Sequence, residues 1–225
     1  MKKSLNSSLK KLVKHDAYLL REDVSERSIT HKLAEHLQRM YPEWHVDCEF
    51  NRNLSGPKSI TISPFDFLHR MASLLDLSKS FNKKSLNLDI LAHEDITLDD
   101  VDYLRNQLLD PENLVYDEEF DLVSFVLRLR DGGELLKTIY PDIIVHKRGT
   151  TDNYIVIEAK KSTNHLKESR LYDLVKLLTL VEANEYKYKK GFFIDLPCGR
   201  DLALHNAFRF EPHLLNKKVY KVRSI

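Results

Sequence analysis

The sequence has little cysteine and no long apolar run. Its two cysteines, Cys48 and Cys198, lie far apart and form no CxxC motif, so neither a disulfide framework nor a structural zinc site is expected. No apolar run approaches the roughly 20 residues that a membrane-spanning helix needs. The first residues contain no unbroken apolar stretch typical of a signal peptide. We therefore expect a cytoplasmic protein that does not bind membranes.

Motifs of two common enzyme classes are also absent from the sequence. There is no GxxxxGK[ST] motif, so the chain is not expected to hydrolyse ATP. None of the ten histidines belongs to an HExxH motif or to an i,i+4 pair, so we interpret them as surface or packing residues.

The composition that remains is typical of a globular protein, and its charge is unevenly distributed. Of 225 residues, 42% are hydrophobic and 31% are charged, which excludes disordered, collagen-like and coiled-coil chains. The net charge is +1, yet residues 94–121 contain eleven Asp or Glu and one Arg, which leaves +11 on the rest of the chain. The positive charge of the residues outside 94–121 favours a polyanionic partner such as nucleic acid.

Hydrophobic spacing predicts an α/β protein in which one long insertion interrupts the core. Residues 1–22 are expected to form a peripheral N-terminal helix, and residues 54–137 a mainly helical, acidic insertion. The core is then made of residues 23–53 and 138–225. Its expected elements, in chain order, are a helix that ends before Pro42, a strand in 45–51, a hairpin over 138–162, a helix over 165–185, a strand over 189–197 and a short strand at 219–225.

The hairpin is the most informative segment, because its register can be predicted from the sequence. If its turn is centred on Thr150, Asp142 lies opposite Glu158, with Cβ atoms roughly 4.5–5.5 Å apart, and His146 lies opposite Tyr154. Lys160 shares the face of the two carboxylates. The other face is apolar and suits a core; it carries Ile143, Val145, Ile155, Ile157 and Ala159.

Two opposed carboxylates on such a hairpin repel each other unless a cation or a proton lies between them. Mg²⁺ takes oxygen ligands and is often held by one or two carboxylates with several waters. Asp142 and Glu158 therefore supply the smallest number of carboxylate ligands that a Mg²⁺ site needs. Next to a metal, the charge of Lys160 can help to orient an attacking water and to stabilise charge on a phosphodiester.

Pro141-Asp142 followed by Glu158-Ala159-Lys160 resembles the PD-(D/E)xK signature of the restriction-endonuclease-like nuclease superfamily. The resemblance covers roughly residues 23–53 and 138–196. It implies a core of helix, three strands, helix and strand, with a mixed central sheet flanked by helices. It also implies a Mg²⁺-dependent endonuclease in which Mn²⁺ can substitute, acting on DNA and leaving a 5′-phosphate.

The same resemblance implies roles for individual residues. Asp142 and Glu158 are expected to hold the metal together with the Ala159 carbonyl, and Lys160 to act on the nucleophile. Glu26, on the first core helix, matches a further acidic position and is expected to support the metal through a second ion or a water. Lys176, on the next helix, is a candidate phosphate contact.

Other interpretations of these residues remain open at the level of sequence. The hairpin carboxylates and Lys160 could form a solvated salt-bridge cluster. Glu26 could complete a capping box with Asp23, and Lys176 could form an i,i+3 ion pair with Asp173. The chain could also be an RNA-directed nuclease, or a catalytically inactive nuclease-fold module that binds nucleic acid or protein.

The acidic stretch of residues 94–121 is expected to stay away from phosphates, because its charge repels them over about a Debye length, roughly 8 Å at physiological salt. We interpret it as a contact with a second copy or another protein, or as a lid over the cleft.

Overall fold

The computed structural model describes residues 1–54, 56–62, 135–164, 167–199, 207–212 and 217–224. The chain divides into two compact units. One consists of Met1–Ser59, Thr138–His165 and Lys176–Ile225, and the other of Ile60–Lys137 and Leu166–Val175. Within the insertion, the sequence predicts helices at residues 65–77 and 97–109, and a segment at 118–130 that could be helix or strand. All three lie outside the described residues.

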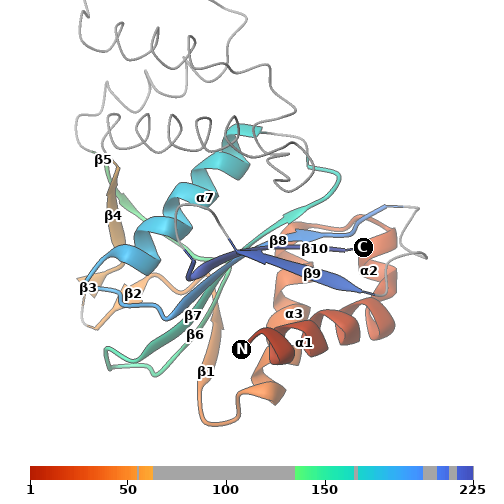
Figure 1. Cartoon of the computed structure of the whole chain (residues 1–225), viewed down its shortest axis with the longest axis horizontal. Helices are drawn as coiled ribbons and strands as arrows, with labels where there is room; N and C mark the ends of the chain where they lie inside the picture. Colours follow the sequence, from red (N-terminus) through yellow and green to blue (C-terminus); the bar gives the residue numbers. More distant parts are fainter. Residues whose placement is uncertain (55, 63–134, 165–166, 200–206, 213–216, 225) are drawn as a thin grey trace, which may run out of the picture. The chain divides into compact units, whose positions relative to one another are not determined.

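A six-stranded mixed sheet forms the centre of the first unit (Figure 1). Its strand order is β1-β6-β7-β8-β10-β9, in which β7, β8 and β10 run parallel to one another and the remaining neighbours are antiparallel. The strands are β1 (His45–Cys48), β6 (Ile143–His146), β7 (Asn153–Lys161), β8 (Lys190–Leu196), β9 (Phe208–Pro212) and β10 (Val219–Ser224). The predicted mixed α/β class is therefore confirmed.

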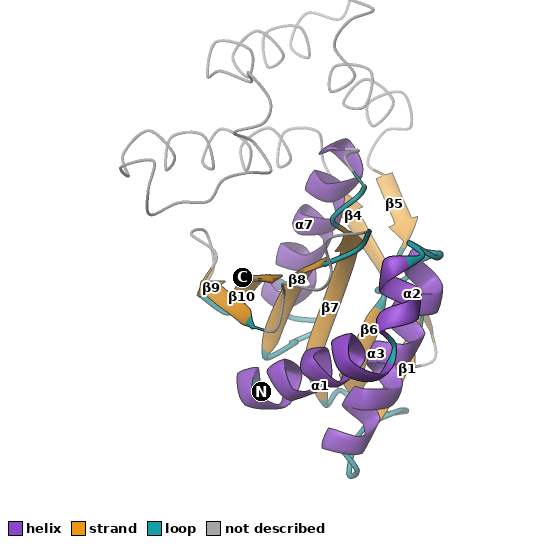
Figure 2. Cartoon of the chain, turned by 90° about the vertical axis from the view of Figure 1, so that its right-hand side faces the viewer, coloured by secondary structure: helices purple, strands orange, loops and turns teal. Residues whose placement is uncertain are grey.

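Three helices cover one face of this sheet: α1 (Lys2–His15), α2 (Ala17–Arg21) and α3 (Glu26–Met40) (Figure 2). Leu5, Leu9 and Leu12 recur at helical spacing on α1, and each is 0% exposed within a core shared with the sheet. Helical structure over residues 1–22 is confirmed, but the prediction that it is peripheral is wrong, because α1 contributes a full apolar stripe to the core.

Helix α3 brings Glu26 to the sheet, because Glu26 is its first residue. The side chain of Ser25 caps the helix by accepting a hydrogen bond from the Ser28 amide at 3.3 Å. The alternative capping box between Asp23 and Glu26 is therefore wrong. The helix ends at Met40, before Pro42, as its sequence predicts.

The opposite face of the sheet is covered by residues from Lys176 onward of helix α7 (Lys167–Glu182). Gly191 of β8 permits this close approach. A Cβ at Gly191 would lie 3.0 Å from side-chain carbons of Leu177 and Val181. Both faces of the hairpin are thereby buried, since Ile144 and Val156 are also 0% exposed.

The register of the hairpin was predicted correctly over most of its length. Ile143 pairs with Ile157 and Val145 pairs with Ile155. A bulge then shifts the pairing, so that His146 pairs with Asn153 and the predicted pairing of His146 with Tyr154 is wrong. The Asn153 side chain donates to the Tyr186 carbonyl at 2.6 Å, which fixes Asn153 on the buried side.

Short strands lie at both ends of the predicted insertion. β2 (Arg52–Asn53) pairs with β3 (Gly56–Pro57), and β4 (Ser59–Ile62) pairs with β5 (Leu135–Thr138). Strand β9, by contrast, is not among the elements that the sequence predicts. None of the helices among the described residues is long and apolar enough to cross a membrane.

Lys58, between β3 and β4, is an unusual residue of the core because it is only 1% exposed. Its ammonium donates to the Tyr188 hydroxyl at 2.7 Å. Burial lowers the pKa of Lys58 from 10.5 to about 8, although the charge of Asp47 acts in the opposite direction. The folded protein therefore holds a lysine that loses its proton more readily than it does in the unfolded chain.

This pKa difference predicts an unusual pH dependence of stability. Between pH 8 and 10.5 the unfolded chain binds the Lys58 proton more tightly than the folded protein does, so the free energy of unfolding rises as pH increases through this window. Below this window, the cost of burying the charged ammonium of Lys58 is fully present. In Lys58→Met this contribution disappears. Chemical denaturation at pH 7.5 and at pH 9.5 measures this effect. Between these two pH values, the free energy of unfolding of the wild type should increase by about 2 kcal/mol more than that of the variant. A constant difference would contradict the assigned pKa, and the exposed Lys10→Met is the control.

Candidate functional site

Asp142 and Glu158 are brought together by the hairpin. Asp142 directly precedes β6, and one further step in the register from the Ile143 and Ile157 pair places it opposite Glu158 of β7. The Asp142 carboxylate accepts a hydrogen bond at 2.7 Å from the backbone amide of Ala159, the residue after Glu158. The position of Asp142 is therefore fixed by the strand that carries the rest of the motif.

Glu158 is 0% exposed, and its negative charge is balanced from α7. The ammonium of Lys176 lies 2.7 Å from Glu158 Oε2, and the Lys176 side chain is itself only 8% exposed. The charge of Glu158 is therefore balanced by a lysine, whereas the expected cation between Glu158 and Asp142 stays a prediction. The role of Lys176 as a phosphate contact stays a prediction, because its ammonium is engaged with Glu158 in this geometry.

Glu26 is linked to the end of β7 through both of its carboxylate oxygens. Lys160 Nζ donates to Glu26 Oε1 at 2.9 Å, and the Lys161 amide donates to Oε2 at 3.1 Å. The Lys160 side chain is 13% exposed, so its ammonium is held in a partly dry position. The structure thus brings Glu26 into the site as a direct partner of the motif lysine.

Lys161 points away from the motif carboxylates and connects β7 to the start of α3. Its ammonium lies 3.0 Å from Asp23 Oδ1 and donates to the carbonyls of Asp23 and Val24. Hydrogen bonds from Lys161 and Thr163 lower the pKa of Asp23, although burial acts in the opposite direction. Lys161 therefore holds the helix start, which agrees with its omission from the predicted catalytic set.

A cavity of about 370 Å³ opens beside Asp142 and Glu26, and sequence reasoning missed most of its lining. The other lining residues are Ser25, Arg27, Thr30 and Glu49. Arg27 Nε donates to Glu49 Oε1 at 2.7 Å, and the Glu49 amide donates to the Asp142 carbonyl at 3.3 Å. Thr30 could have been found by its spacing, because it lies four residues after Glu26 on one helix face. The pairing of Arg27 with Glu49 has no local sequence signal.

The donors around this site fit a hard divalent cation. They are carboxylate and hydroxyl oxygens, which are the ligands that Mg²⁺ prefers. Within the described part of the chain, no group of three or more His, Cys, Asp and Glu side chains is arranged to hold a metal ion. A Mg²⁺ site needs only one or two protein carboxylates. Asp142 lines the cavity but Glu158 does not, so their joint role as metal ligands stays a prediction. The Ala159 carbonyl as a third ligand stays a prediction.

The cysteines are poor candidates for a nucleophile. Cys48 and Cys198 are both free and partly buried. Burial, reinforced by neighbouring carboxylates, raises the pKa of each thiol to about 12. Because the thiolate is the reactive form, neither residue is suited to attack a substrate at neutral pH.

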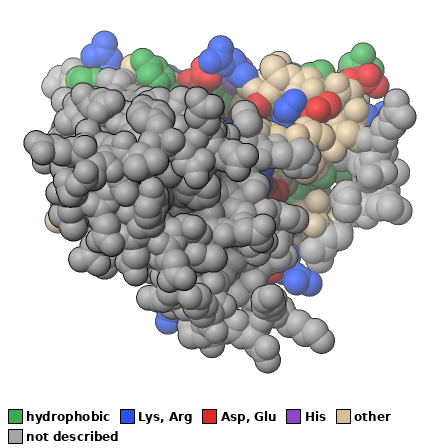
Figure 3. Space-filling view, turned by 90° about the horizontal axis from the view of Figure 1, so that it is seen from above, with side chains coloured by type: hydrophobic (Ala, Val, Ile, Leu, Met, Phe, Trp, Pro, Cys, Tyr) green, Lys and Arg blue, Asp and Glu red, His purple; other side chains and the backbone are tan. Residues whose placement is uncertain are grey.

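Charges of both signs are visible on the described side chains in Figure 3. Comparisons with protein-family models, curated proteins and solved structures found no match to this chain. We therefore base the functional proposal on the geometry of the residues described above.

Proposed function

We propose that this chain is a metal-dependent endonuclease with a restriction-endonuclease-like core, acting on DNA. The observation that carries the proposal is the arrangement of three motif residues. Asp142, directly before β6, lies opposite Glu158 of β7, and Lys160 follows on β7 in contact with Glu26. A buried and a partly buried carboxylate placed in this way suit a site that binds a hard cation.

The order of elements supports the same proposal. In chain order, α3, β1, β6, β7, α7 and β8 form the series of one helix, three strands, one helix and one strand that the PD-(D/E)xK resemblance implies. β1, β6 and β7 are antiparallel neighbours, and β8 is parallel to β7. The motif residues lie where that series predicts, directly before the second strand and on the third.

Each motif residue has a role that its surroundings allow. Asp142 and Glu158 would hold Mg²⁺, with the Ala159 carbonyl as a further oxygen. A bound Mg²⁺ supplies a more acidic water and polarises the phosphodiester. Asp142 is oriented for this role by the Ala159 amide, and Glu158 is oriented by Lys176.

Lys160 would place a positive charge where negative charge develops on the phosphate. Glu26 holds its ammonium at 2.9 Å, so the charge needs little reorganisation during the reaction. In this arrangement Glu26 orients Lys160. The predicted part of Glu26 in binding a second ion or a water stays a prediction.

A substrate panel tests the proposal and identifies the polymer. The purified chain is incubated with supercoiled plasmid, linear duplex, single-stranded DNA and RNA, each with Mg²⁺, Mn²⁺ or EDTA. We expect supercoiled plasmid to be nicked with Mg²⁺ or Mn²⁺ and to stay intact with EDTA. Cleavage of RNA alone would instead establish the RNA-directed alternative. The absence of cleavage of all four polymers with either metal would contradict the proposal.

A catalytically inactive binding module is the second candidate, and one observation favours it. Glu158 and Glu26 are each already paired with a lysine of the same chain, so the charges are balanced by protein groups. Binding of DNA that does not depend on Mg²⁺, together with no cleavage in the panel, would support this candidate.

A further inference from the structure

Basic residues precede three neighbouring strands at one end of the sheet. β7, β8 and β10 run parallel, with Ile155 of β7 paired to Lys190 and Gly191 of β8 paired to Val219 of β10. Their N-terminal ends therefore lie side by side. The basic residues before these ends are Lys147 and Arg148 for β7, Lys187 and Lys189 for β8, and Lys217 and Lys218 for β10. The candidate active site lies towards the other end of β7.

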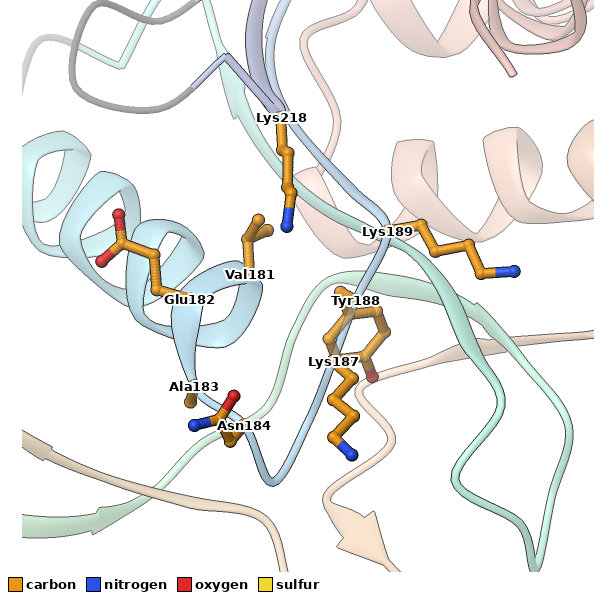
Figure 4. Close-up of a pocket in the computed structure, with 8 residues that line it drawn as sticks. All are labelled: Val181, Glu182, Ala183, Asn184, Lys187, Tyr188, Lys189 and Lys218. Carbon is orange, nitrogen blue, oxygen red and sulfur yellow. The ribbon is translucent and has the colours of Figure 1, made fainter.

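We call Lys187, Lys189, Lys217 and Lys218 the basic edge, and all four are exposed. Tyr188 points into the protein and is 1% exposed, whereas its neighbours Lys187 and Lys189 are exposed (Figure 4). Among the described residues, no carboxylate forms an ion pair with Lys187, Lys189 or Lys217. These ammonium groups are thus exposed to an external anion.

The basic edge borders a hollow of about 270 Å³ at the end of α7 (Figure 4). Lys187, Lys189 and Lys218 line it together with Asn184, and Glu182 is the one acidic residue in the lining. The lining therefore carries three positive charges and one negative charge, in addition to an amide that can donate hydrogen bonds. This combination suits an anionic group such as a phosphate.

An aromatic pair extends this surface towards the hairpin turn. The Tyr154 ring stacks on Trp44 with a centroid separation of 4.7 Å. Lys189 Nζ lies 5.4 Å from the Tyr154 centroid, and Lys147 Nζ lies 5.3 Å from the Trp44 centroid. The contact with Tyr154 leaves the charge of Lys189 unneutralised at the surface, whereas the Lys147 ammonium also pairs with Asp152 at 3.8 Å.

We propose that the basic edge binds the phosphate backbone of DNA at a distance from the bond that is cleaved. The proposal rests on the proposed nuclease function and adds a second contact region for its substrate. The three strand ends span roughly 10 Å, a length over which duplex DNA presents about six phosphates. Exposed like charges in so small an area repel one another, and a polyanion relieves that repulsion.

Strand β7 separates this surface from the candidate active site. From Tyr154 to Lys160 the strand advances about 20 Å. The basic edge would therefore contact DNA about 20 Å from the bond that is cleaved.

The test measures DNA binding separately from cleavage. A fluorescent 25-base-pair duplex is titrated in EDTA with wild type and with the triple variant Lys187→Gln, Lys189→Gln and Lys217→Gln. The matched control replaces Lys10, Lys14 and Lys32, which lie on α1 and α3, by Gln. We expect the triple variant to raise Kd at least tenfold and to reduce the slope of log K against log salt by two to three, since each lost phosphate contact removes about 0.9. The control should change Kd by less than twofold.

Equal Kd and equal salt slope in the two triple variants would overturn the proposal, as would absence of duplex binding by the wild type. Binding of phosphatidylserine vesicles, with no binding of duplex, would assign the surface to membranes and also overturn it. Thermal denaturation checks that the variants are folded. If binding is lost in the triple variant but no protein cleaves any substrate, the basic edge stands and the nuclease assignment fails. If the wild type cleaves and the triple variant binds normally, the nuclease assignment stands and the basic edge fails.

Discussion

Lys160→Ala is expected to lower the single-turnover rate of DNA cleavage by about a hundredfold or more while leaving Mg²⁺ affinity nearly unchanged. A lysine ammonium cannot bind the metal. Its expected contribution is to stabilise the negative charge that develops in the transition state. Glu26 fixes that ammonium at 2.9 Å in a site that is largely shielded from water, which makes the charge more effective than an exposed one.

Rapid-quench cleavage and calorimetric titration of Mg²⁺ measure the two quantities separately. Lys32→Ala is the matched control, because Lys32 forms a comparable pair with Glu35 on the exposed surface of α3. Loss of Mg²⁺ binding in Lys160→Ala would show that the lysine organises the metal ligands instead. An unchanged cleavage rate would remove Lys160 from the mechanism.

Lys176→Met is expected to destabilise the protein by about 3–5 kcal/mol, because it leaves the carboxylate of Glu158 buried without its cation. Glu158 is 0% exposed, so water cannot easily replace the lost ammonium. Adding Glu158→Leu to the same protein should recover most of the loss, since replacing both members of a buried ion pair by apolar residues is often nearly neutral. Denaturant unfolding of the two variants measures both effects.

Lys176→Met also tests whether Glu158 is a metal ligand or serves only to pair with Lys176. If Glu158 binds Mg²⁺, the ion should raise the Tm of Lys176→Met more than that of wild type, because Lys176 no longer competes for the carboxylate. The double variant with Glu158→Leu should show no such increase. A Tm of Lys176→Met that is insensitive to Mg²⁺ would argue that Glu158 is held only for the ion pair.

The sequence predicts the hairpin that carries the motif because period-two alternation and turn residues are local signals. The register from Ile143 to Ile157 follows from them, and so does the opposition of Asp142 and Glu158. The bulge at His146 does not, because it depends on the Asn153 contact with Tyr186, which lies 33 residues away in the chain. Strand β9 has a local signal, because Phe208 and Phe210 alternate with polar residues, but the alternation is too short to predict a strand by itself.

The partners of the site residues could not be predicted from sequence. The pairing of Lys176 with Glu158 depends on how α7 packs over β7 and β8. Gly191 permits this close packing, but a single glycine in the sequence does not predict it. Spacing also shows that α1 has an apolar stripe, yet not that the stripe covers the sheet core. Long-range packing thus decides the burial and charge balance of a site whose chemistry the local pattern suggests.

The most direct measurement of the central claim is plasmid cleavage by wild type and Asp142→Asn, each with Mg²⁺ and with EDTA. Asp152→Asn makes the same charge change in the exposed hairpin turn and serves as the control. The account predicts nicked plasmid only for wild type and Asp152→Asn in Mg²⁺, with Asp142→Asn inactive and folded. Equal cleavage by Asp142→Asn, or by wild type in EDTA, would contradict it.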